Sequence, residues 1–325
     1  MGIEIIGIGS YLPEQVLTNA DLEKIVDTTD EWITQRTGIK ERHIADKNQA
    51  TSDLAIKAAK RAIKKAKISP EEIDAIIVGT VTPDMFFPST ACFVQAGVGA
   101  SNAAAFDISA ACSGFIYGIG IARDFIRSGT YKTVMVIGAE TLSKITDRQD
   151  RNICVLLGDG AGAVILRKTN SNSEIMSVHL GADGSYHDLL FIPGGGSRNP
   201  ATHKTVDDRL HYMKMEGNKV FKLAVKSMVD SATKAIQLAG IKCEDIKLFI
   251  PHQANIRIIE AVAKQMNVPM EKVFLNIQKY GNTSAATTPI ALEEAIYENK
   301  VKKGDIVLLV AFGGGLTWAA TVIKL

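Results

Sequence analysis

The sequence predicts an α/β protein built from two halves with the same βα topology. The main observation is an internal repeat, in which residues 62–77 align with residues 235–250 at an offset of 173 positions. The same offset places the apolar run 134–139 on residues 307–312. Because two separate segments share one offset, one supersecondary unit is expected to occur twice, although unrelated helix–strand units can also look alike.

The composition indicates a globular protein with a large core. Of 325 residues, 46% are hydrophobic and 22% are charged, and the net charge is +2. A charge this close to zero gives no strong attraction to nucleic acid or to anionic membranes. No apolar run approaches the ~18 residues that span a bilayer, and no secretion signal is recognised. We therefore expect a cytoplasmic protein with neither a nucleic-acid nor a membrane partner.

The cysteines are scattered along the chain. They stand at positions 92, 112, 154 and 243 and form no CxxC pair. This spacing argues against a disulfide framework and against a zinc site, so we expect no metal.

In the first half, apolar periodicity and capping residues predict strands that alternate with helices. The first strand ends in Gly-Ile-Gly-Ser, which lacks the third glycine of a dinucleotide-binding fingerprint. Asn19 is the predicted cap of one helix, and Thr51 or Ser52 caps a later one. Residues 36–43 are interpreted as a basic turn. The expected strands lie at 3–9, 74–80, 133–139 and 161–167. The expected helices lie at 19–26, 28–35 and 51–67; a further helix starts at 89–96, and another follows Cys112 and ends near residue 128.

The second half follows a glycine-rich polar segment at 193–200, and turn-forming residues continue to about position 209. We place the boundary between the halves near position 170, which gives residues 1–170 and residues 171–325. The expected elements are helices at 218–238, 255–266 and 284–298, and strands at 247–250, 306–311 and 317–324.

Cys112 is the leading candidate for a nucleophile. It follows Asp-Ile-Ser-Ala-Ala, and apolar residues recur behind it at helical spacing, which places it at the first turn of a buried helix. Unpaired N–H groups and the helix dipole at such a site favour a thiolate, so we expect a pKa below the ordinary ~8.5. The small neighbours leave room for a ligand. The alternative is that Cys112 is only a small buried hydrophobic residue.

Three further segments carry candidate chemistry. His252, in Pro-His-Gln-Ala-Asn, follows an apolar strand, a place where active-site side chains are common. Asn282 lies in Gly-Asn-Thr-Ser-Ala-Ala, and three glycines at 313–315 follow another strand. The alternatives are a structural histidine, a helix cap and a hairpin turn. The repeat offset aligns Gly79 with His252, so the candidates lie at equivalent element ends of the two halves.

Together these motifs resemble the β-ketoacyl-[acyl-carrier-protein] synthase III family, the condensing enzymes that initiate type II fatty acid synthesis. The resemblance rests on Ala-Ala-Cys-Ser-Gly-Phe and on the histidine and asparagine motifs, and it extends over nearly the whole chain. It implies a thiolase-like fold with the two halves in a layered αβαβα arrangement. It also implies a homodimer in which Phe87 enters the acyl pocket of the second copy.

The resemblance implies a reaction in two steps with no cofactor, because CoA and phosphopantetheine enter as parts of the substrates. Cys112 takes an acetyl group or a short or branched acyl group from acyl-CoA. Backbone N–H groups of Cys112 and Gly314 form the oxyanion hole. Malonyl-acyl carrier protein then loses CO₂, and neutral His252 and Asn282 donate to its enolate. Attack on the acyl-cysteine yields the β-ketoacyl carrier protein.

The resemblance also assigns binding residues. It places Trp32, Arg36 and Thr37 at the adenine and phosphates of CoA, Arg151 at a second nucleotide contact, and Asn255 near the pantetheine arm. An indole face suits a base, and a guanidinium suits phosphate. Asn152 follows Arg151 where some family members have glycine, which puts the local backbone contact in doubt.

Basic residues on two predicted helices are expected to meet the acidic carrier protein. Lys219, Lys222 and Lys226 share one helix face, and Arg257 and Lys264 lie seven residues apart on another helix. The resemblance assigns the carrier contacts to Lys222, Arg257 and Lys264. Without it, these residues are a solvated charged face.

Two other functions remain as alternatives. One is another thiolase-fold enzyme, such as a CoA-dependent acyltransferase or a condensing enzyme of secondary metabolism. A thiolase proper needs a second reactive cysteine late in the chain, where the last cysteine is Cys243. The other is a binding scaffold without activity, which would not need the Cys–His–Asn set.

Overall fold

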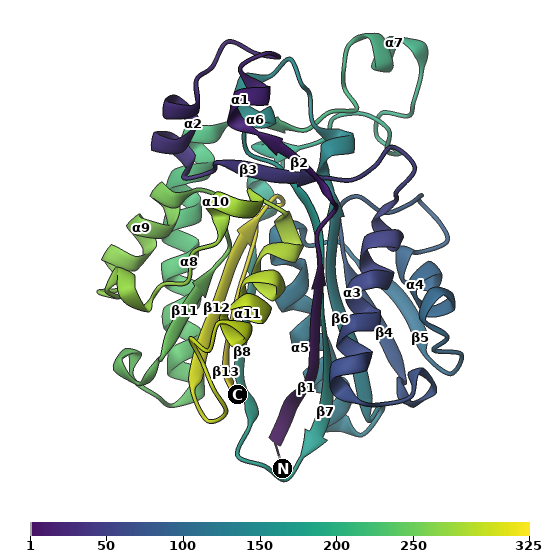
Figure 1. Cartoon of the computed structure of the whole chain (residues 1–325), viewed down its shortest axis with the longest axis vertical. Helices are drawn as coiled ribbons and strands as arrows, with labels where there is room; N and C mark the ends of the chain where they lie inside the picture. The colour runs from purple at the N-terminus through teal and green to yellow at the C-terminus, as the bar shows by residue number, and fades with distance from the viewer. Residues whose placement is uncertain (1) are drawn as a thin grey trace.

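Two main sheets dominate the computed structural model, which describes residues 2–325 (Figure 1). The first sheet has the order β1-β7-β6-β4-β5, and the second has the order β11-β12-β13-β8. The strands of the first sheet are β1 (Gly2–Tyr11), β4 (Ala75–Gly79), β5 (Ala104–Ile108), β6 (Thr133–Thr141) and β7 (Asp159–Thr169). Those of the second are β8 (Glu174–Ala182), β11 (Leu248–Pro251), β12 (Ile306–Gly313) and β13 (Thr317–Lys324).

The two sheets share one topology. β4 pairs parallel with β6, and β11 pairs parallel with β12. β7 then lies antiparallel between β6 and β1, as β13 lies between β12 and β8. The offset of 173 takes the first residues of β4 and β6 onto the first residues of β11 and β12. The predicted α/β class with two duplicated halves is therefore confirmed, and the boundary between residues 1–170 and 171–325 stays a prediction.

The long helices complete five layers. The central layer, between the sheets, holds α5 (Gly114–Ser128) and α11 (Thr287–Tyr297). The outer layers hold α3 (Thr51–Ala66) and α4 (Thr90–Val98) on the first sheet, and α8 (Gly217–Ala239) and α9 (Ile256–Gln265) on the second. Three separate clusters of buried apolar side chains fill the spaces between these layers, as the predicted αβαβα arrangement requires.

Short elements gather at one end of the molecule, at the top of Figure 1. They are β2 (Gln15–Thr18), β3 (Glu41–Ile44), α1 (Asn19–Leu22), α2 (Asp30–Thr37), α6 (Arg151–Cys154), α7 (His203–Asp207), α10 (Ile277–Tyr280), β9 (Leu190–Phe191) and β10 (Lys214–Met215). The 3-10 helices are η1 (Pro70–Glu72), η2 (Ala111–Ser113), η3 (Leu142–Ile145), η4 (Gly184–Tyr186), η5 (Cys243–Asp245), η6 (Met270–Lys272) and η7 (Ser284–Ala286). No helix among residues 2–325 combines the length and apolar character needed to cross a membrane.

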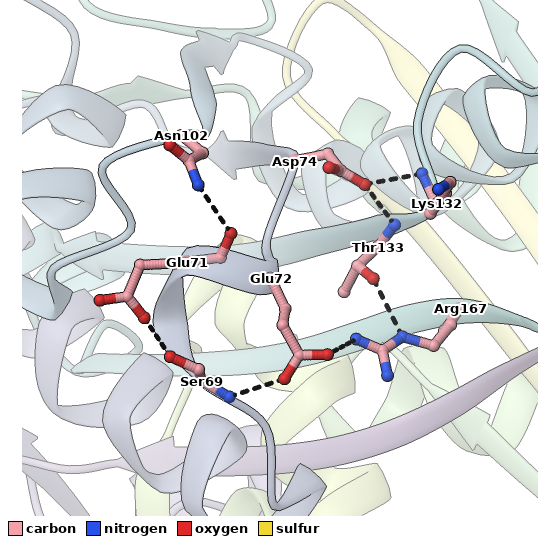
Figure 2. Close-up of polar contacts among 8 residues, drawn as sticks. All are labelled: Ser69, Glu71, Glu72, Asp74, Asn102, Lys132, Thr133 and Arg167. Atoms are coloured by element: carbon pink, nitrogen blue, oxygen red, sulfur yellow. Dashed lines mark hydrogen bonds and ion pairs between the residues drawn. The ribbon is translucent and has the colours of Figure 1, made fainter.

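A polar network fixes the opposite end of the first sheet (Figure 2). The Asp74 carboxylate accepts from the backbone N–H groups of Lys132, at 2.7 Å, and Thr133, at 2.8 Å. Arg167 on β7 donates to the Thr133 hydroxyl at 2.9 Å and pairs with Glu72 at 3.0 Å. The network thus links the starts of β4 and β6 to each other and to β7.

Two predicted helix caps were wrong. α1 is capped by Thr18, whose hydroxyl accepts from Asp21 N at 3.2 Å, whereas the Asn19 side chain donates to Ile39 O at 2.8 Å. α3 begins after Ala50, whose N–H donates to Asp53 Oδ2 at 2.8 Å. A tertiary partner therefore takes Asn19 away from the capping role, and the Asp53 carboxylate serves the start of α3 instead.

The predicted basic turn at 36–43 was also wrong. Residues 41–44 form β3, and Arg42 on it is completely buried. Its guanidinium donates to Leu17 O at 3.1 Å, Asn19 Oδ1 at 2.9 Å and Val155 O at 2.7 Å. Burial lowers the pKa of Arg42 to about 10. Acceptors from two distant segments, at 17–19 and at 155, make this burial possible, and sequence spacing does not reveal them.

Candidate active site

Two similar turns face each other where the halves meet. η2 begins at Ala111 with φ 46°, and η7 begins at Ser284 with φ 49°, so both adopt the left-handed conformation at positions that are 173 residues apart. Each turn leads directly into a central helix, α5 or α11. Cys112 is the second residue of η2, and Ala285 is its equivalent in η7. The duplication thus provides two similar turns, of which one carries the thiol.

Each turn packs against a strand of the other half. A side chain at Gly313 on β12 would place its Cβ 2.5 Å from Cys112 N, and one at Gly138 on β6 would place it 2.2 Å from Ala285 O. Such distances are below any real contact, so both positions require glycine. The close approach brings the two halves together at the thiol.

Two cavities meet at Cys112. The first, of about 690 Å³, is lined by Cys112, His252 and Asn282 and opens among the short elements. The second, of about 420 Å³, is lined by Cys112, Asn282 and mainly apolar side chains. The structure therefore brings the three predicted catalytic residues to one cavity and places an apolar chamber beside it.

The pKa of Cys112 shifts in the direction opposite to the predicted one. Burial raises it to about 12, although the neighbouring Ser284 hydroxyl lowers it in part. Glu140 raises it further as a nearby negative charge. A helix N-terminus is a local feature that favours the thiolate, but here the loss of solvent around the sulfur outweighs it. The free protein accordingly holds a thiol, and the proton must leave during reaction.

His252 is held as a neutral imidazole. It follows β11, is 3% exposed, and burial lowers its pKa to about 3. Its Nδ1 lies 2.6 Å from Thr287 Oγ1, which also contacts Ser284 O at 3.0 Å. If the Thr287 hydroxyl donates its hydrogen bond to Ser284 O, Nδ1 of His252 carries the ring proton and donates to Thr287 Oγ1. If the hydroxyl donates to Nδ1 instead, the ring proton is on Nε2. The contacts of Thr287 therefore allow either tautomer of His252.

The repeat explains why only the second half holds this pair. The offset aligns His252 with Gly79 and Thr287 with Gly114. A Cβ at Gly79 would lie 2.7 Å from Gly114 C, so the first half has no room for side chains there. In the first half, the strand end and the central helix meet through the backbone of Gly79 and Gly114. In the second half, the equivalent positions are His252 and Thr287, which meet through their side chains.

Asn282 has a fixed orientation. Its Oδ1 accepts from Ser284 N at 2.8 Å, its N–H donates to Leu156 O at 2.9 Å, and its carbonyl accepts from Gly158 N at 3.0 Å. With the side-chain oxygen engaged, the amide NH₂ group is the part left to donate into the cavity. No protein acceptor for this NH₂ group is found among residues 2–325.

The predicted oxyanion donors also lack protein partners. Within residues 2–325, neither Cys112 N nor Gly314 N donates to a backbone or side-chain oxygen. Both residues line the second cavity. Two unpaired N–H groups near a nucleophile suit a developing oxyanion.

Aromatic and basic residues surround the entrance of the first cavity. The guanidinium of Arg36 lies 5.2 Å from the Trp32 ring centre, and that of Arg151 lies 4.9 Å from it. Trp32, Arg36, Thr37 and Asn255 line this cavity, whereas Arg151 lies outside it. The Thr37 hydroxyl donates to Ile33 O of its own helix at 2.7 Å, so its proton is not available to a ligand.

The other predicted contacts lie further out. Lys222 and Arg257 line the mouth of the first cavity, and Lys264 is an exposed residue on α9 outside the lining. Phe87 lines neither cavity and is 84% exposed. The structure therefore joins Lys222 and Arg257 to the site and leaves Lys264 and Phe87 on the surface of the single chain.

Sequence reasoning missed three polar residues of the site: Glu140, Ser284 and Thr287. A signal was present in the repeat, because these residues align with Gly313, Ala111 and Gly114 respectively. Cys112 and His252 follow the same pattern, with Ala285 and Gly79 as their equivalents. A polar residue in one half opposite glycine or alanine in the other marks a place where the halves have diverged.

Two family models match the chain. The model of 3-oxoacyl-[acyl-carrier-protein (ACP)] synthase III matches residues 106–184, and the model of its C-terminal part matches residues 236–325. A curated relative, the β-ketoacyl-[acyl-carrier-protein] synthase III of Caldanaerobacter subterraneus subsp. tengcongensis, is 60% identical over 98% of this chain and 97% of its own length.

Solved structures agree with these matches. The crystal structure of 3-oxoacyl-[acyl-carrier-protein] synthase III from Aquifex aeolicus VF5 has a TM-score of 0.93 and 53% identity over 100% of both chains. The priming β-ketosynthase of the R1128 polyketide pathway has a TM-score of 0.91 and 32% identity over 99% of this chain and 96% of its own. The predicted thiolase-like fold is confirmed, and the chain belongs to the β-ketoacyl-[acyl-carrier-protein] synthase III family.

Proposed function

We propose that this protein condenses an acyl-CoA starter with malonyl-acyl carrier protein, with loss of CO₂, and so initiates fatty acid synthesis. The observation that carries this function is the meeting of Cys112, His252 and Asn282 at one cavity, in a chain that belongs to this family. The products are β-ketoacyl-acyl carrier protein, CO₂ and CoA.

In the first half-reaction, Cys112 Sγ attacks the thioester carbonyl of acyl-CoA and expels the CoA thiolate. The unpaired N–H groups of Cys112 and Gly314 support the oxyanion of the tetrahedral intermediate. The acyl chain lies in the second cavity, which is apolar and about 420 Å³ in volume. Nucleotide and pantetheine lie in the first cavity, so the carbonyl sits where both cavities meet.

In the second half-reaction, malonyl-acyl carrier protein replaces CoA in the first cavity. Loss of CO₂ leaves an enolate whose charge lies on the thioester oxygen. Asn282 donates from its free NH₂ group, and His252 donates from Nε2 in the tautomer in which Thr287 donates to Nδ1. A neutral imidazole suits this role, because burial holds the pKa of His252 at about 3. The enolate carbon attacks the acyl-cysteine and releases the β-ketoacyl product.

The proposed chemistry needs no resident cofactor, because both acyl carriers enter as substrates. Among residues 2–325, no group of three or more His, Cys, Asp and Glu side chains could hold a metal ion. We place the protein in the cytoplasm, where acyl-CoA and acyl carrier protein are available.

We also propose a homodimer. Met85, Phe86 and Phe87 are consecutive apolar residues with exposures of 48%, 84% and 84%, an arrangement that is unfavourable for a single chain in water. Phe87 would enter the acyl pocket of the second copy. The basic residues Lys222, Arg257 and Lys264 would meet the acidic carrier protein near the cavity mouth.

Intact-mass measurement after incubation with a panel of acyl-CoAs tests the function. We expect a mass gain equal to one acyl group, located on Cys112, which disappears when malonyl-acyl carrier protein is added. The donor that reacts fastest identifies the starter. An adduct that malonyl-acyl carrier protein cannot discharge would instead favour a CoA-dependent acyltransferase, and the absence of any adduct would contradict the assignment.

The 32% identity to a priming ketosynthase of a polyketide pathway favours one second candidate, a condensing enzyme of secondary metabolism. The same two half-reactions would then deliver the product to a different carrier protein. Comparing discharge by fatty-acid and polyketide carrier proteins, each loaded with malonate, separates the two functions.

Arg36→Ala is expected to raise the KM for acyl-CoA about 10-fold and to leave kcat nearly unchanged. Arg36 lies at the cavity entrance beside Trp32, and a hydrogen bond to a charged phosphate contributes about 1.5–3 kcal/mol. Steady-state kinetics measures the effect. An acyl thioester of N-acetylcysteamine, which has no nucleotide, is the control and should show the same KM with both proteins. A 10-fold effect on this short donor would contradict the nucleotide contact.

A further inference from the structure

The reaction described above leaves one buried acid without a role. Glu140 lies at the end of β6 and is completely buried. Its Oε2 accepts from Thr82 Oγ1 at 2.7 Å, Thr80 Oγ1 at 3.1 Å and Val81 N at 3.1 Å. Its Oε1 has a single partner, Val81 N at 3.2 Å, so this oxygen has free capacity to accept.

No positive charge compensates Glu140. Within residues 2–325, no Lys or Arg side chain forms a hydrogen bond or ion pair with it. β7 presents Asp159 to the neighbouring Thr141, but that carboxylate binds Ala45 N and Ser143. The other titratable group that faces Glu140 is Cys112 on η2. Burial raises the pKa of Glu140 to about 7.

Ser284 is the first residue of η7, which packs against both β6, the strand of Glu140, and η2, the turn of Cys112. The Ser284 hydroxyl acts as a hydrogen-bonding neighbour that lowers the pKa of both Cys112 and Glu140. The hydroxyl oxygen is nonetheless buried without a hydrogen bond of ordinary geometry. A buried hydroxyl without a partner is costly, and the Ser284 hydroxyl keeps its capacity both to donate and to accept. Ser284 also lines the second cavity, where the acyl group of the proposed function lies.

We propose that Ser284 and Glu140 form a proton relay for Cys112, in which Ser284 passes the thiol proton to the Glu140 carboxylate during acylation and returns it during condensation. In this relay Ser284 exchanges the proton with Cys112 Sγ directly, and Glu140 acts only through Ser284. The proposal rests on the acylation of Cys112 described under the proposed function.

The protons balance over both half-reactions. As Sγ bonds to the thioester carbonyl, the S–H proton moves to Ser284 Oγ, the Ser284 hydroxyl proton moves to Glu140 Oε1, and CoA leaves as a thiolate that takes a proton from solvent. In the second half-reaction the Cys112 thiolate is released and receives the proton back by the reverse path. The pair carries one negative charge before acylation, on the Glu140 carboxylate, and none in the acyl-enzyme, because that charge leaves with the CoA thiolate.

Timing follows from the two acidities. The pKa of Cys112 is about 12 and that of Glu140 about 7, so the proton leaves only as the sulfur–carbon bond forms. Glu140 must be ionised to accept it. Acylation should therefore rise with pH to a plateau above about pH 7, and the pKa of this profile belongs to Glu140.

Two variants test the relay by rapid-mixing measurement of acylation between pH 5.5 and 9. Glu140→Gln still accepts a hydrogen bond from Ser284 but takes no proton. We expect acylation about 10²-fold slower, near the lower end for general-base catalysis, with the ionisation near pH 7 lost from the profile. The KM for acyl-CoA should not change, because Glu140 does not line the first cavity.

Ser284→Ala should show the same loss of rate and the same flat profile. The variant should fold, because Ala111 holds the same left-handed conformation at the equivalent position of η2. The double variant should be no slower than either single variant, since both break one path. Thermal unfolding checks that the fold is kept.

Ser113→Ala is the matched control. Ser113 is also buried next to Cys112, and its hydroxyl also has no partner among the described residues. We expect the wild-type rate and pH profile from this variant. Wild-type acylation kinetics in Ser284→Ala would overturn the relay. Failure of the wild-type protein itself to acylate would contradict the proposed function instead.

Discussion

Cys112→Ala is expected to abolish covalent acylation and to slow condensation by more than about 10⁴-fold. The substitution removes the sulfur that carries the acyl group, and losses of this size follow removal of a nucleophile in covalent catalysis. The variant should fold normally, because the equivalent turn, η7, holds Ala285 at the same position. Intact-mass measurement after incubation with acyl-CoA should show no adduct.

The same variant tests whether the two half-reactions are separable. His252 and Asn282 remain in place, so Cys112→Ala should still release CO₂ from malonyl-acyl carrier protein. Cys92→Ala is the matched control, since Cys92 is an exposed cysteine that lines neither cavity, and this variant should acylate at the wild-type rate. An acyl adduct on Cys112→Ala that malonyl-acyl carrier protein discharges would place the nucleophile elsewhere.

The duplicated fold could be predicted because its signal is periodic and local. Helices α3 and α8 are amphipathic, and each precedes a buried strand. The shared offset of 173 residues shows that the two helix–strand units are equivalent. The structure adds the hairpin of β2 and β3, which the sequence did not reveal because its short strands are separated by 22 residues, Asn19–Lys40. β8 was also missed, since one of its faces is only partly buried and its residues do not form a continuous apolar run.

The catalytic set was predictable for a different reason. Cys112, His252 and Asn282 lie in short motifs at the ends of helices and strands, and such motifs can be recognised directly in the sequence. Glu140 belongs to no such motif, and Ser284 lies in the Asn282 motif without any signal of a role of its own. Glu140 continues a buried strand, and it meets Ser284 only because β6 packs against η7 of the other half, at Gly138.

The pKa of Cys112 shows the same limit in energetic terms. The helix N-terminus that favours a thiolate is readable from the sequence, whereas the surroundings that remove solvent from the sulfur come from both halves. The effect of burial is the larger one, so the predicted direction of the Cys112 pKa shift was wrong. A nucleophile of high pKa requires a proton acceptor, and the motif around Cys112 does not indicate one.

Asn282→Ala and Asn282→Asp are expected to acylate at near the wild-type rate and to condense about 10²–10³-fold more slowly, the usual cost of one lost oxyanion donor. The two variants separate donation from structure. Aspartate keeps an oxygen that accepts from Ser284 N, whereas alanine removes it, and neither retains the NH₂ group. The acyl-enzyme is formed first, and its discharge by malonyl-acyl carrier protein is then followed by mass. If the donor role is right, both variants accumulate acyl-enzyme that discharges slowly. Fast discharge in Asn282→Asp with slow discharge in Asn282→Ala would mean that the side chain only supports η7, and the enolate charge would then rest on His252 alone.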